Sequence, residues 1–445
     1  MTVKYFGTDG IRGKSNQEPI TAGTALRIGQ AIGKYFSTNV GQQRVIIGKD
    51  TRLSGYMLEP ALTAGFVSVG INVALVGPMP TPAVAALTKS MDFDIGLMIS
   101  ASHNLYQDNG IKIFGSDGFK LSDLVEGEIE ILIDSVRSKS LASPDGLGKV
   151  SHLSGAADWY IDYVKNTFPE KQDLSGLKVV LDCANGAAYR VGPEILSQLG
   201  AKVISIGIDP NGYNINEGCG STNLESLSKK VIEEKADVGI ALDGDADRVV
   251  FCDEKGETID GDQIMALIAQ DWAKKDKIKG KTIVGTLMSN YGLEKYLSEI
   301  GLLLERSKVG DRYVVETMLH NGYNFGGEQS GHIILSDFST TGDGLIAALQ
   351  ALSIINSSGK RVSNAAKVFM PVPQKLNNIK YKSPDLLTLD SVQSVIRSAE
   401  KRLDGKGRIL VRKSGTEPLI RVMVESEDVS LMDSVMDEVL NILDG

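Results

Sequence analysis

The sequence of 445 residues is poor in cysteine and contains no long apolar run. Its three cysteines (Cys183, Cys219 and Cys252) form no CxxC pair and cannot all pair with one another, which favours a reducing compartment over a disulfide framework. No stretch approaches the roughly 20 consecutive apolar residues of a membrane-spanning helix, and the first residues show no apolar signal-peptide segment. These absences predict a cytoplasmic protein without a membrane partner.

The sequence also lacks a basic stripe. Its net charge is −9, with both signs interspersed along the chain, so we expect no nucleic-acid partner. The length exceeds that of one ordinary core and predicts two to four domains. Glycine is abundant, with 48 residues, and many glycines stand beside polar residues, as tight loops near a ligand require.

Three parts of the chain repeat one order of elements: an apolar run, a helical stretch, a second apolar run and a dense polar motif. Strands alternating with helices predict α/β units on largely parallel sheets. Loops after such strands are where α/β folds bind ligands, so three copies could bring three loops to one cleft. The first runs are Val45–Gly48, Val179–Leu181 and Ile283–Val284, the second are Val73–Val76, Val203–Ile206 and Leu302–Leu304, and the motifs are SASHN at 100–104, DGDADR at 243–248 and GEQSGH at 327–332.

Composition places the domain limits. A loop at Ser138–Gly148, a turn at Asp253–Gly256 and an extended connector at Met370–Pro373 separate the units. After the connector we expect an α+β module of different make, with helices at Ser391–Arg402 and Leu431–Leu443 and strands at Ile409–Arg412 and Leu419–Val424. The expected domains are 1–150, 151–256, 257–368 and 369–445.

The acidic motif after the apolar run DVGIAL indicates a metal site. Asp243, Asp245 and Asp247 alternate with small residues, which in an extended loop would place three carboxylates on one side. Their mutual repulsion favours a hard divalent cation. An EF-hand is excluded, because Arg248 stands where its sharp turn needs glycine and a strand precedes the loop. A solvated acidic turn is the simpler alternative.

The other motifs carry hydroxyl, imidazole and cationic groups. Ser102 follows an apolar run and could be a nucleophile, although a G-x-S-x-G elbow is absent and an ordinary polar turn is an alternative. Glu328, Ser330 and His332 stand at alternate positions. This alternation would place three hydrogen-bonding groups on one side, as a multi-hydroxyl ligand needs. The segment RKSGTEP at 412–418, followed by Arg421, combines hydroxyls, glycine and arginines in the manner of a phosphate cradle. Nucleotide-binding loops are not supported, since each near-match lacks a required glycine or strand.

Taken in order, these motifs resemble the α-D-phosphohexomutase superfamily over nearly the whole chain. The similar strings are KYFGTDGIRG, ISASHN, DNGIKIF, LDGDADR, TLMSN followed by GLE, KVGDRYV, GEQSGH and RKSGTEPLIRVM. The resemblance implies three similar α/β domains with mostly parallel mixed sheets and a C-terminal α+β domain around one central cleft. Relatives usually have proline after the SHN triplet, where this chain has Leu105.

The resemblance also implies an activity and the residues that serve it. The reaction would interconvert glucosamine 6-phosphate and glucosamine 1-phosphate through a glucosamine 1,6-bisphosphate, feeding UDP-N-acetylglucosamine synthesis. Glucose or mannose phosphates are the alternative substrates, and a serine phosphatase or a non-catalytic sugar-phosphate sensor would be alternatives of other classes. A homodimer is left open. The implied roles are phosphoserine for Ser102; Mg²⁺ binding for Ser102, Asp243, Asp245 and Asp247; sugar binding for Glu328, Ser330 and His332; phosphate binding for Arg412, Ser414, Gly415, Thr416 and Arg421; and a place at the reacting centre for Arg12, His103, Lys112 and Arg248.

Overall fold

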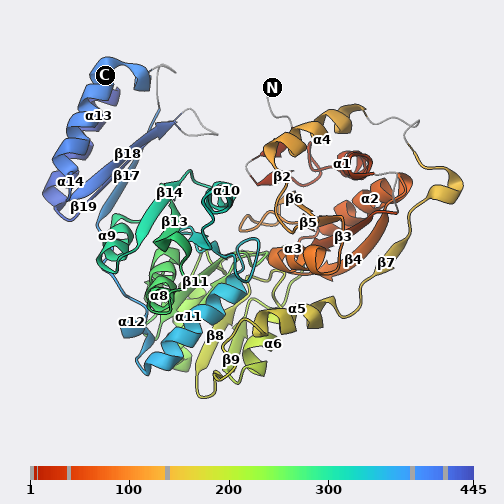
Figure 1. Ribbon diagram of the computed structural model, residues 1–445, viewed down its shortest axis with the longest axis horizontal. Helices are drawn as coiled ribbons and strands as arrows, with labels where there is room; N and C mark the ends of the chain where they lie inside the picture. The colour runs from red at the N-terminus through yellow and green to blue at the C-terminus, as the bar shows by residue number, and fades with distance from the viewer. Residues whose placement is uncertain are drawn as a thin grey trace.

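A computed structural model describes residues 5–7, 9–37, 42–135, 141–380, 386–413 and 419–444. The described chain forms three mixed sheets covered by helices, followed by a small antiparallel sheet near the C-terminus (Figure 1). The expected α/β class, with three similar units and a different C-terminal module, is confirmed. Within the described residues, no helix is both long and apolar enough to cross a membrane.

The first sheet has the strand order β1-β2-β6-β5-β3-β4-β7. Strands β3, β4, β5 and β7 pair in parallel, whereas β6 and β2 run antiparallel to their neighbours. Helices α1, α2 and α4 cover one face and α3 covers the other. The strands are β1 (Phe6–Gly7), β2 (Gly10–Lys14), β3 (Arg44–Lys49), β4 (Asn72–Pro78), β5 (Ile95–Ile99), β6 (Asp108–Gly115) and β7 (Val150–His152); the helices are α1 (Ala22–Phe36), α2 (Gly55–Ser68), α3 (Thr81–Ser90), α4 (Asp123–Ser135) and the 3₁₀ turn η2 (Pro144–Gly146).

The second and third sheets repeat this plan on a smaller scale. Their strand orders are β12-β11-β10-β8-β9 and β14-β13-β15-β16, with a parallel centre and an antiparallel edge in each. The second unit contains α5 (Ala156–Lys165), β8 (Lys178–Asp182), α6 (Val191–Gln198), β9 (Lys202–Ile206), α7 (Glu225–Glu234), β10 (Val238–Leu242), β11 (Val249–Asp253) and β12 (Thr258–Ile259). The third contains α8 (Gly261–Lys274), η3 (Lys279–Lys281), β13 (Thr282–Thr286), α9 (Tyr291–Glu299), β14 (Leu303–Ser307), α10 (Asp311–Asn321), β15 (Phe325–Gly327), β16 (Ile333–Leu335), α11 (Gly344–Ser358) and α12 (Val362–Ala365).

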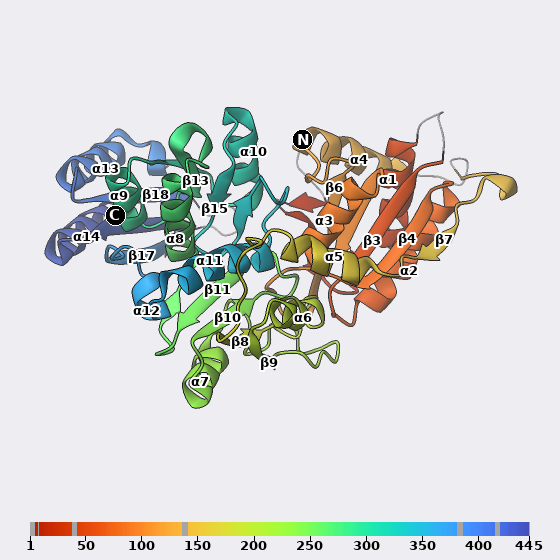
Figure 2. The same ribbon diagram turned by 60° about the horizontal axis from the view of Figure 1, so that its bottom comes forward.

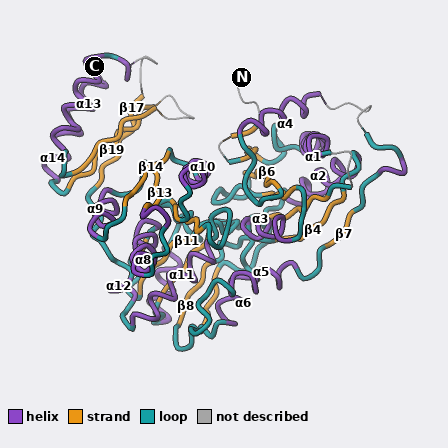
Figure 3. Tube along the Cα trace, viewed as in Figure 1, coloured by secondary structure: helices purple, strands orange, loops and turns teal. Residues whose placement is uncertain are grey.

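One hairpin recurs in all three sheets and explains where the polar motifs lie. In each sheet a parallel strand turns back into an antiparallel neighbour, giving the pairs β5–β6, β10–β11 and β15–β16. The motifs at 100–104, 243–248 and 327–332 lie at these three turns. Figure 3 shows loop segments gathered in the middle of the molecule, between the labelled strands β6, β11 and β13.

A single core joins the three α/β units. Alternate strand residues face opposite sides: Ile283 belongs to this large core, whereas the adjacent Val284 packs beneath α10 in a smaller cluster. The almost wholly buried helix α11 packs on β10, β11 and β16 and so bridges the second and third units (Figure 2).

The C-terminal module has its own core. Its sheet, ordered β17-β19-β18, is antiparallel and is covered by α13 and α14, whose apolar residues form a separate cluster. The elements are β17 (Gln374–Lys380), η4 (Leu386–Thr388), α13 (Asp390–Leu403), β18 (Gly407–Lys413), β19 (Leu419–Ser426) and α14 (Val429–Asp444). The two predicted helices and two predicted strands are confirmed, and β17 was missed.

Candidate active site

Ser102 lies at the turn between β5 and β6, with 1% of its surface exposed. Its hydroxyl donates a hydrogen bond of 2.6 Å to Oδ2 of Asp243 and lies 3.3 Å from Nδ1 of His103. Its backbone has φ +52°, in the left-handed region that residues other than glycine rarely adopt. The turn therefore presents the serine oxygen directly to the acidic motif of the second unit.

The acidic motif brings its three carboxylates together by a tight turn. One oxygen from each of Asp243, Asp245 and Asp247 lies within 4.8 Å of the others, and all three residues are buried. The extended loop expected from the alternation was wrong: Ala246 has φ +58° and its N–H donates to the Asp243 carbonyl. Thr81, at the start of α3, donates its hydroxyl to Asp245 at 2.6 Å, which ties the turn to the first unit.

Lys112 on β6 places a buried cation against these acids. Its Nζ donates to Asp245 at 2.8 Å and to Asp247 at 2.9 Å, and lies 3.5 Å from Asp9. Burial alone would lower the pKa of this ammonium, but the neighbouring carboxylates outweigh it and raise the pKa of Lys112 well above its usual range. Lys112 therefore keeps its charge and holds the acidic turn.

The acidic turn fits a hard divalent cation. Burial, reinforced by Asp247 and Asp245, raises the pKa of Asp243 well above its ordinary value, which shows how strongly this site resists three negative charges without further cations. One oxygen each of Asp245 and Asp247 is buried and has no hydrogen-bond partner among the described residues. Three converging carboxylates without histidine or cysteine suit Mg²⁺.

Arg12, Arg248 and His103 also lie at this centre. Arg12 donates to Asp9, and Arg248 approaches Asp247 at 4.0 Å. Burial, helped by the two arginines, lowers the pKa of His103 to about 4, so its imidazole is neutral at pH 7. The five residues expected at the reacting centre, Ser102, His103, Lys112, Arg12 and Arg248, are therefore all placed around the acidic turn.

The motif at 327–332 forms a hairpin turn between β15 and β16, so alternation does not place its polar groups on one side. Glu328 is buried and accepts a hydrogen bond from the N–H of Gly310, while Ser330 is exposed. The buried His332 turns inward, with Nε2 at 3.6 Å from Asp311 and 3.9 Å from Asp247. The structure thus places His332 within the charged cluster and Ser330 at the surface of the turn.

Arg412 and Arg421 face each other on the C-terminal sheet as directly paired residues of β18 and β19. Burial, together with the charge of Arg421, lowers the pKa of Arg412. Like charges directly opposite one another destabilise a strand pair, and an anion between them would relieve the repulsion. Figure 1 shows this sheet set apart from the domain that carries Ser102. The expected phosphate ligands Ser414, Gly415 and Thr416 lie outside the described residues.

Sequence reasoning missed a charged bridge between the first and third units. Lys120 donates to both Asp9 and Asp311, and Asp9 also contacts Arg12 and Lys112. Asp9 and Asp311 stand in the strings GTDGIRG and KVGDRYV, so the resemblance was the signal that could have found them. The bridge extends the charged cluster from the first unit to the third.

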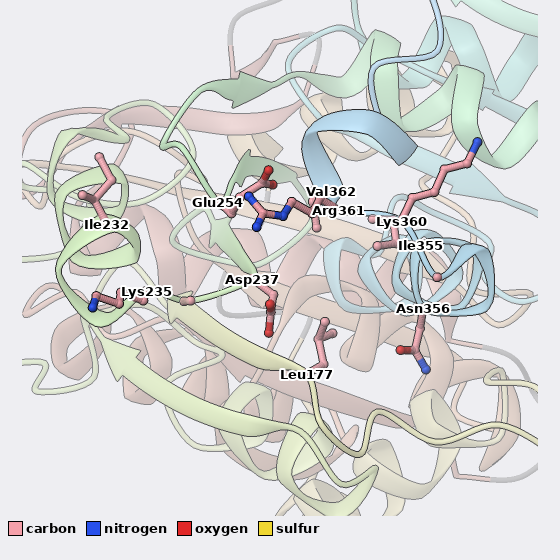
Figure 4. A pocket seen from close by; sticks show the side chains of 12 residues that line it. Leu177, Ile232, Lys235, Asp237, Glu254, Ile355, Asn356, Lys360, Arg361 and Val362 are labelled. Atoms are coloured by element: carbon pink, nitrogen blue, oxygen red, sulfur yellow. The ribbon is translucent and has the colours of Figure 1, made fainter.

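A separate groove of about 530 Å³ lies at the seam of the second unit with α11 and α12. Figure 4 shows the side chains of Lys235 and Lys360 extending to opposite ends of this groove. Its two lysines therefore do not converge on one ligand position, and none of its residues belongs to a predicted motif. The buried cluster around Ser102 is the candidate active site.

Comparison with known proteins defines the class. Four consecutive parts of the sequence match the phosphoglucomutase/phosphomannomutase family: alpha/beta/alpha domain I at residues 3–140, domain II at 158–256, domain III at 260–372 and the C-terminal domain at 372–442. The chain belongs to this family.

Relatives narrow the comparison. The phosphoglucosamine mutase of Parvibaculum lavamentivorans is 56% identical over 444 residues, covering 100% of this chain and 99% of the relative. The phosphoglucosamine mutase of Azorhizobium caulinodans is 57% identical over 443 residues, with the same coverage. Among solved structures, a phosphoglucomutase/phosphomannomutase family protein from Burkholderia thailandensis has a TM-score of 0.82 at 22% identity, covering 98% of this chain and 96% of that one. This structural likeness supports the fold.

Proposed function

We propose that the chain is an isomerase that interconverts glucosamine 6-phosphate and glucosamine 1-phosphate in the cytoplasm. Full-length relatives at 56% and 57% identity carry the name phosphoglucosamine mutase. The observation that carries the chemistry is the 2.6 Å hydrogen bond from the Ser102 hydroxyl to Asp243, which places a hydroxyl against a cation-binding carboxylate turn. Such a pair suits a serine that carries and transfers a phosphoryl group.

In the proposed reaction Ser102 first gives its phosphoryl group to the sugar phosphate and then takes a different phosphoryl group back from the bisphosphate. The 1-hydroxyl of glucosamine 6-phosphate attacks the phosphorus on Ser102, the P–O bond to the serine breaks, and glucosamine 1,6-bisphosphate forms. The hydroxyl proton passes to the neutral imidazole of His103, since Lys112 already carries its own proton. After the bisphosphate reorients in the site, the Ser102 oxygen attacks the 6-phosphorus and the P–O6 bond breaks. O6 takes up the proton that His103 received, and glucosamine 1-phosphate leaves. Phosphoryl transfer depends mainly on positioning and on neutralising spread negative charge, and the cluster provides Lys112, Arg12 and Arg248 for this.

Mg²⁺ would be held by Asp243, Asp245 and Asp247 with an oxygen of Ser102 or its phosphate. When bound, it supplies charge neutralisation to the transferring phosphoryl group. Glu328 and Ser330, on the turn of the third unit, would meet sugar hydroxyls. Arg412 and Arg421, with the segment 414–416, would hold the phosphate that is not being transferred, since paired guanidinium groups bind a tetrahedral anion well.

A glucose or mannose phosphate is the second candidate substrate, because the matching family is named for phosphoglucomutase and phosphomannomutase. The test compares kcat/KM for glucosamine, glucose and mannose 6-phosphates and measures inorganic phosphate released in the same reactions. We expect glucosamine 6-phosphate to exceed glucose 6-phosphate by at least ~100-fold, since a site built to hydrogen-bond one group discriminates by such factors. Equal or reversed preference would move the function to the second candidate. Stoichiometric phosphate release would instead identify a phosphatase.

A further inference from the structure

Residues 100–104, which carry Ser102 and are here called the nucleophile turn, are held through their main chain by the buried side chains of Arg52 and Asn216. The Ser102 carbonyl accepts hydrogen bonds from Nη2 of Arg52 at 2.8 Å and from Nδ2 of Asn216 at 2.9 Å. The Asn104 carbonyl accepts from the same two groups at 2.8 and 2.9 Å. Arg52 belongs to the first unit and Asn216 to the second, so the turn is clamped across the seam between them.

The Arg52 side of the clamp also fixes the N–H of Ser102. Asp50 accepts a 2.7 Å hydrogen bond from Nε of Arg52 and another of 2.7 Å from the Ser100 hydroxyl. Ser100 Oγ in turn accepts the N–H of Ser102 at 2.9 Å. Arg52 also donates to the carbonyls of Leu105 and Asp108. The network thus controls both main-chain polar groups of Ser102.

The Asn216 side of the clamp joins the turn to the metal-binding motif. A Cβ atom at Gly244 would lie 2.7 Å from the Ser102 carbonyl oxygen and 2.8 Å from Nδ2 of Asn216. The glycine therefore lets the acidic turn rest directly on the clamped carbonyl. Asn216 sits where the nucleophile turn and the acidic turn meet.

The hydrogen bonds from Arg52 and Asn216 hold Ser102 in a backbone conformation that serine rarely adopts. The left-handed backbone at φ +52° is unfavourable for a serine and persists only where its surroundings fix it. We propose that Asn216 is a positioning residue for phosphoryl transfer: with Arg52 it holds Ser102 in the left-handed conformation that aims Oγ at Asp243. This inference rests on the proposed function, because it assigns Asn216 to the transfer step at Ser102.

Asn216→Gly tests the inference with little backbone strain. Asn216 has φ +58°, which glycine adopts freely, so the substitution removes the side-chain amide and its Cβ without adding backbone strain. Misplacement of a reacting group by about 1 Å can cost about 100-fold, so we expect kcat to fall ~10- to 100-fold while KM for the sugar phosphate changes less than ~3-fold. Asn16→Gly is the matched control, since exposed Asn16 has φ +60° in the first unit, and it should behave as the wild type.

A second variant, Asn216→Asp, keeps the size and shape of the side chain but faces two carbonyl oxygens with a carboxylate. It should lose more activity than the glycine variant. If the melting temperature of the glycine variant is well below that of the wild type, the aspartate variant is used to test the inference instead. An Asn216→Gly enzyme equal to Asn16→Gly, an Asp variant better than the Gly variant, or a loss confined to KM would overturn the inference. A wild type without mutase activity would instead overturn the proposed function.

Discussion

Ser102 and Asp243 are 141 positions apart in the chain, yet the hydroxyl of the first donates a 2.6 Å hydrogen bond to the carboxylate of the second. The contact joins the hairpin turn of one sheet to the equivalent turn of the next. Two similar folding units therefore supply the two halves of the proposed phosphoryl-transfer site, the candidate nucleophile and the candidate cation-binding turn. The following predictions test the parts of this arrangement.

Removal of one carboxylate should weaken Mg²⁺ binding while leaving the fold intact. We expect Mg²⁺ to raise the melting temperature of the wild type, because a ligand that binds only the folded state at 100 times its Kd adds about 2.7 kcal/mol. Asp245→Asn should lose most of this shift and most turnover, and EDTA should abolish wild-type activity reversibly. Asp209→Asn, at an exposed position of the same unit, is the control. Full activity in EDTA would contradict the metal assignment.

The paired arginines of the C-terminal sheet should serve both directions of the reaction. If the bisphosphate reorients in the site between the two transfers, Arg412 and Arg421 hold the 6-phosphate in one half-reaction and the 1-phosphate in the other. Arg421→Ala should reduce kcat/KM in both directions by similar factors, corresponding to roughly 2–4 kcal/mol for a charge-assisted contact, and should release more free bisphosphate. Arg397→Ala, exposed on α13 of the same module, should change neither. A loss in one direction only would rule out a shared cradle.

The folding stability of the protein should depend on pH through Asp262, which lies near the seam between the third unit and the C-terminal module. Burial, reinforced by Asp260, raises the pKa of Asp262 to about 8, and its carboxyl accepts the N–H of Asn290 at 2.7 Å. Folding therefore takes up a proton between the unfolded pKa, near 4, and pH 8, so this group's contribution to stability falls as the pH rises through that window.

Asp262→Asn removes this titration and keeps the shape. Relative to the variant, the wild type should lose roughly 1–2.5 kcal/mol of unfolding free energy between pH 6 and pH 8. Denaturant unfolding at several pH values measures the difference between the two proteins. Parallel stability curves across this range would show that Asp262 does not titrate there.

The sequence predicted one parallel pair of strands in each α/β sheet (β3 with β4, β8 with β9, and β13 with β14), because each of these strands contains an apolar run. It missed β17, whose sequence QKLNNIK is polar and mostly exposed and so leaves no apolar pattern. It also gave the acidic motif an extended shape, since the left-handed conformation of Ala246 follows from packing and has no signature in that residue type.

The candidate site was predictable where a motif concentrates its groups, as for Ser102 and the three aspartates. The groups that arrange it were not. Arg52 and Asn216 are single polar residues in ordinary segments, and their role depends on the meeting of two units far apart in the sequence. Lys120 likewise acquires its role only because Asp9 and Asp311 approach it in the fold.

The most direct test follows a phosphoryl group from Ser102 to the sugar. Wild-type protein is incubated with glucosamine 1,6-bisphosphate whose phosphorus is labelled, separated from free ligand, and mapped to locate the label. The labelled protein is then mixed with unlabelled glucosamine 6-phosphate and Mg²⁺. The account predicts one label per chain on Ser102, no labelling of Ser102→Ala, and transfer of the label to glucosamine phosphates within one turnover. Label on another residue, label that stays on the protein, or label released as inorganic phosphate would contradict it.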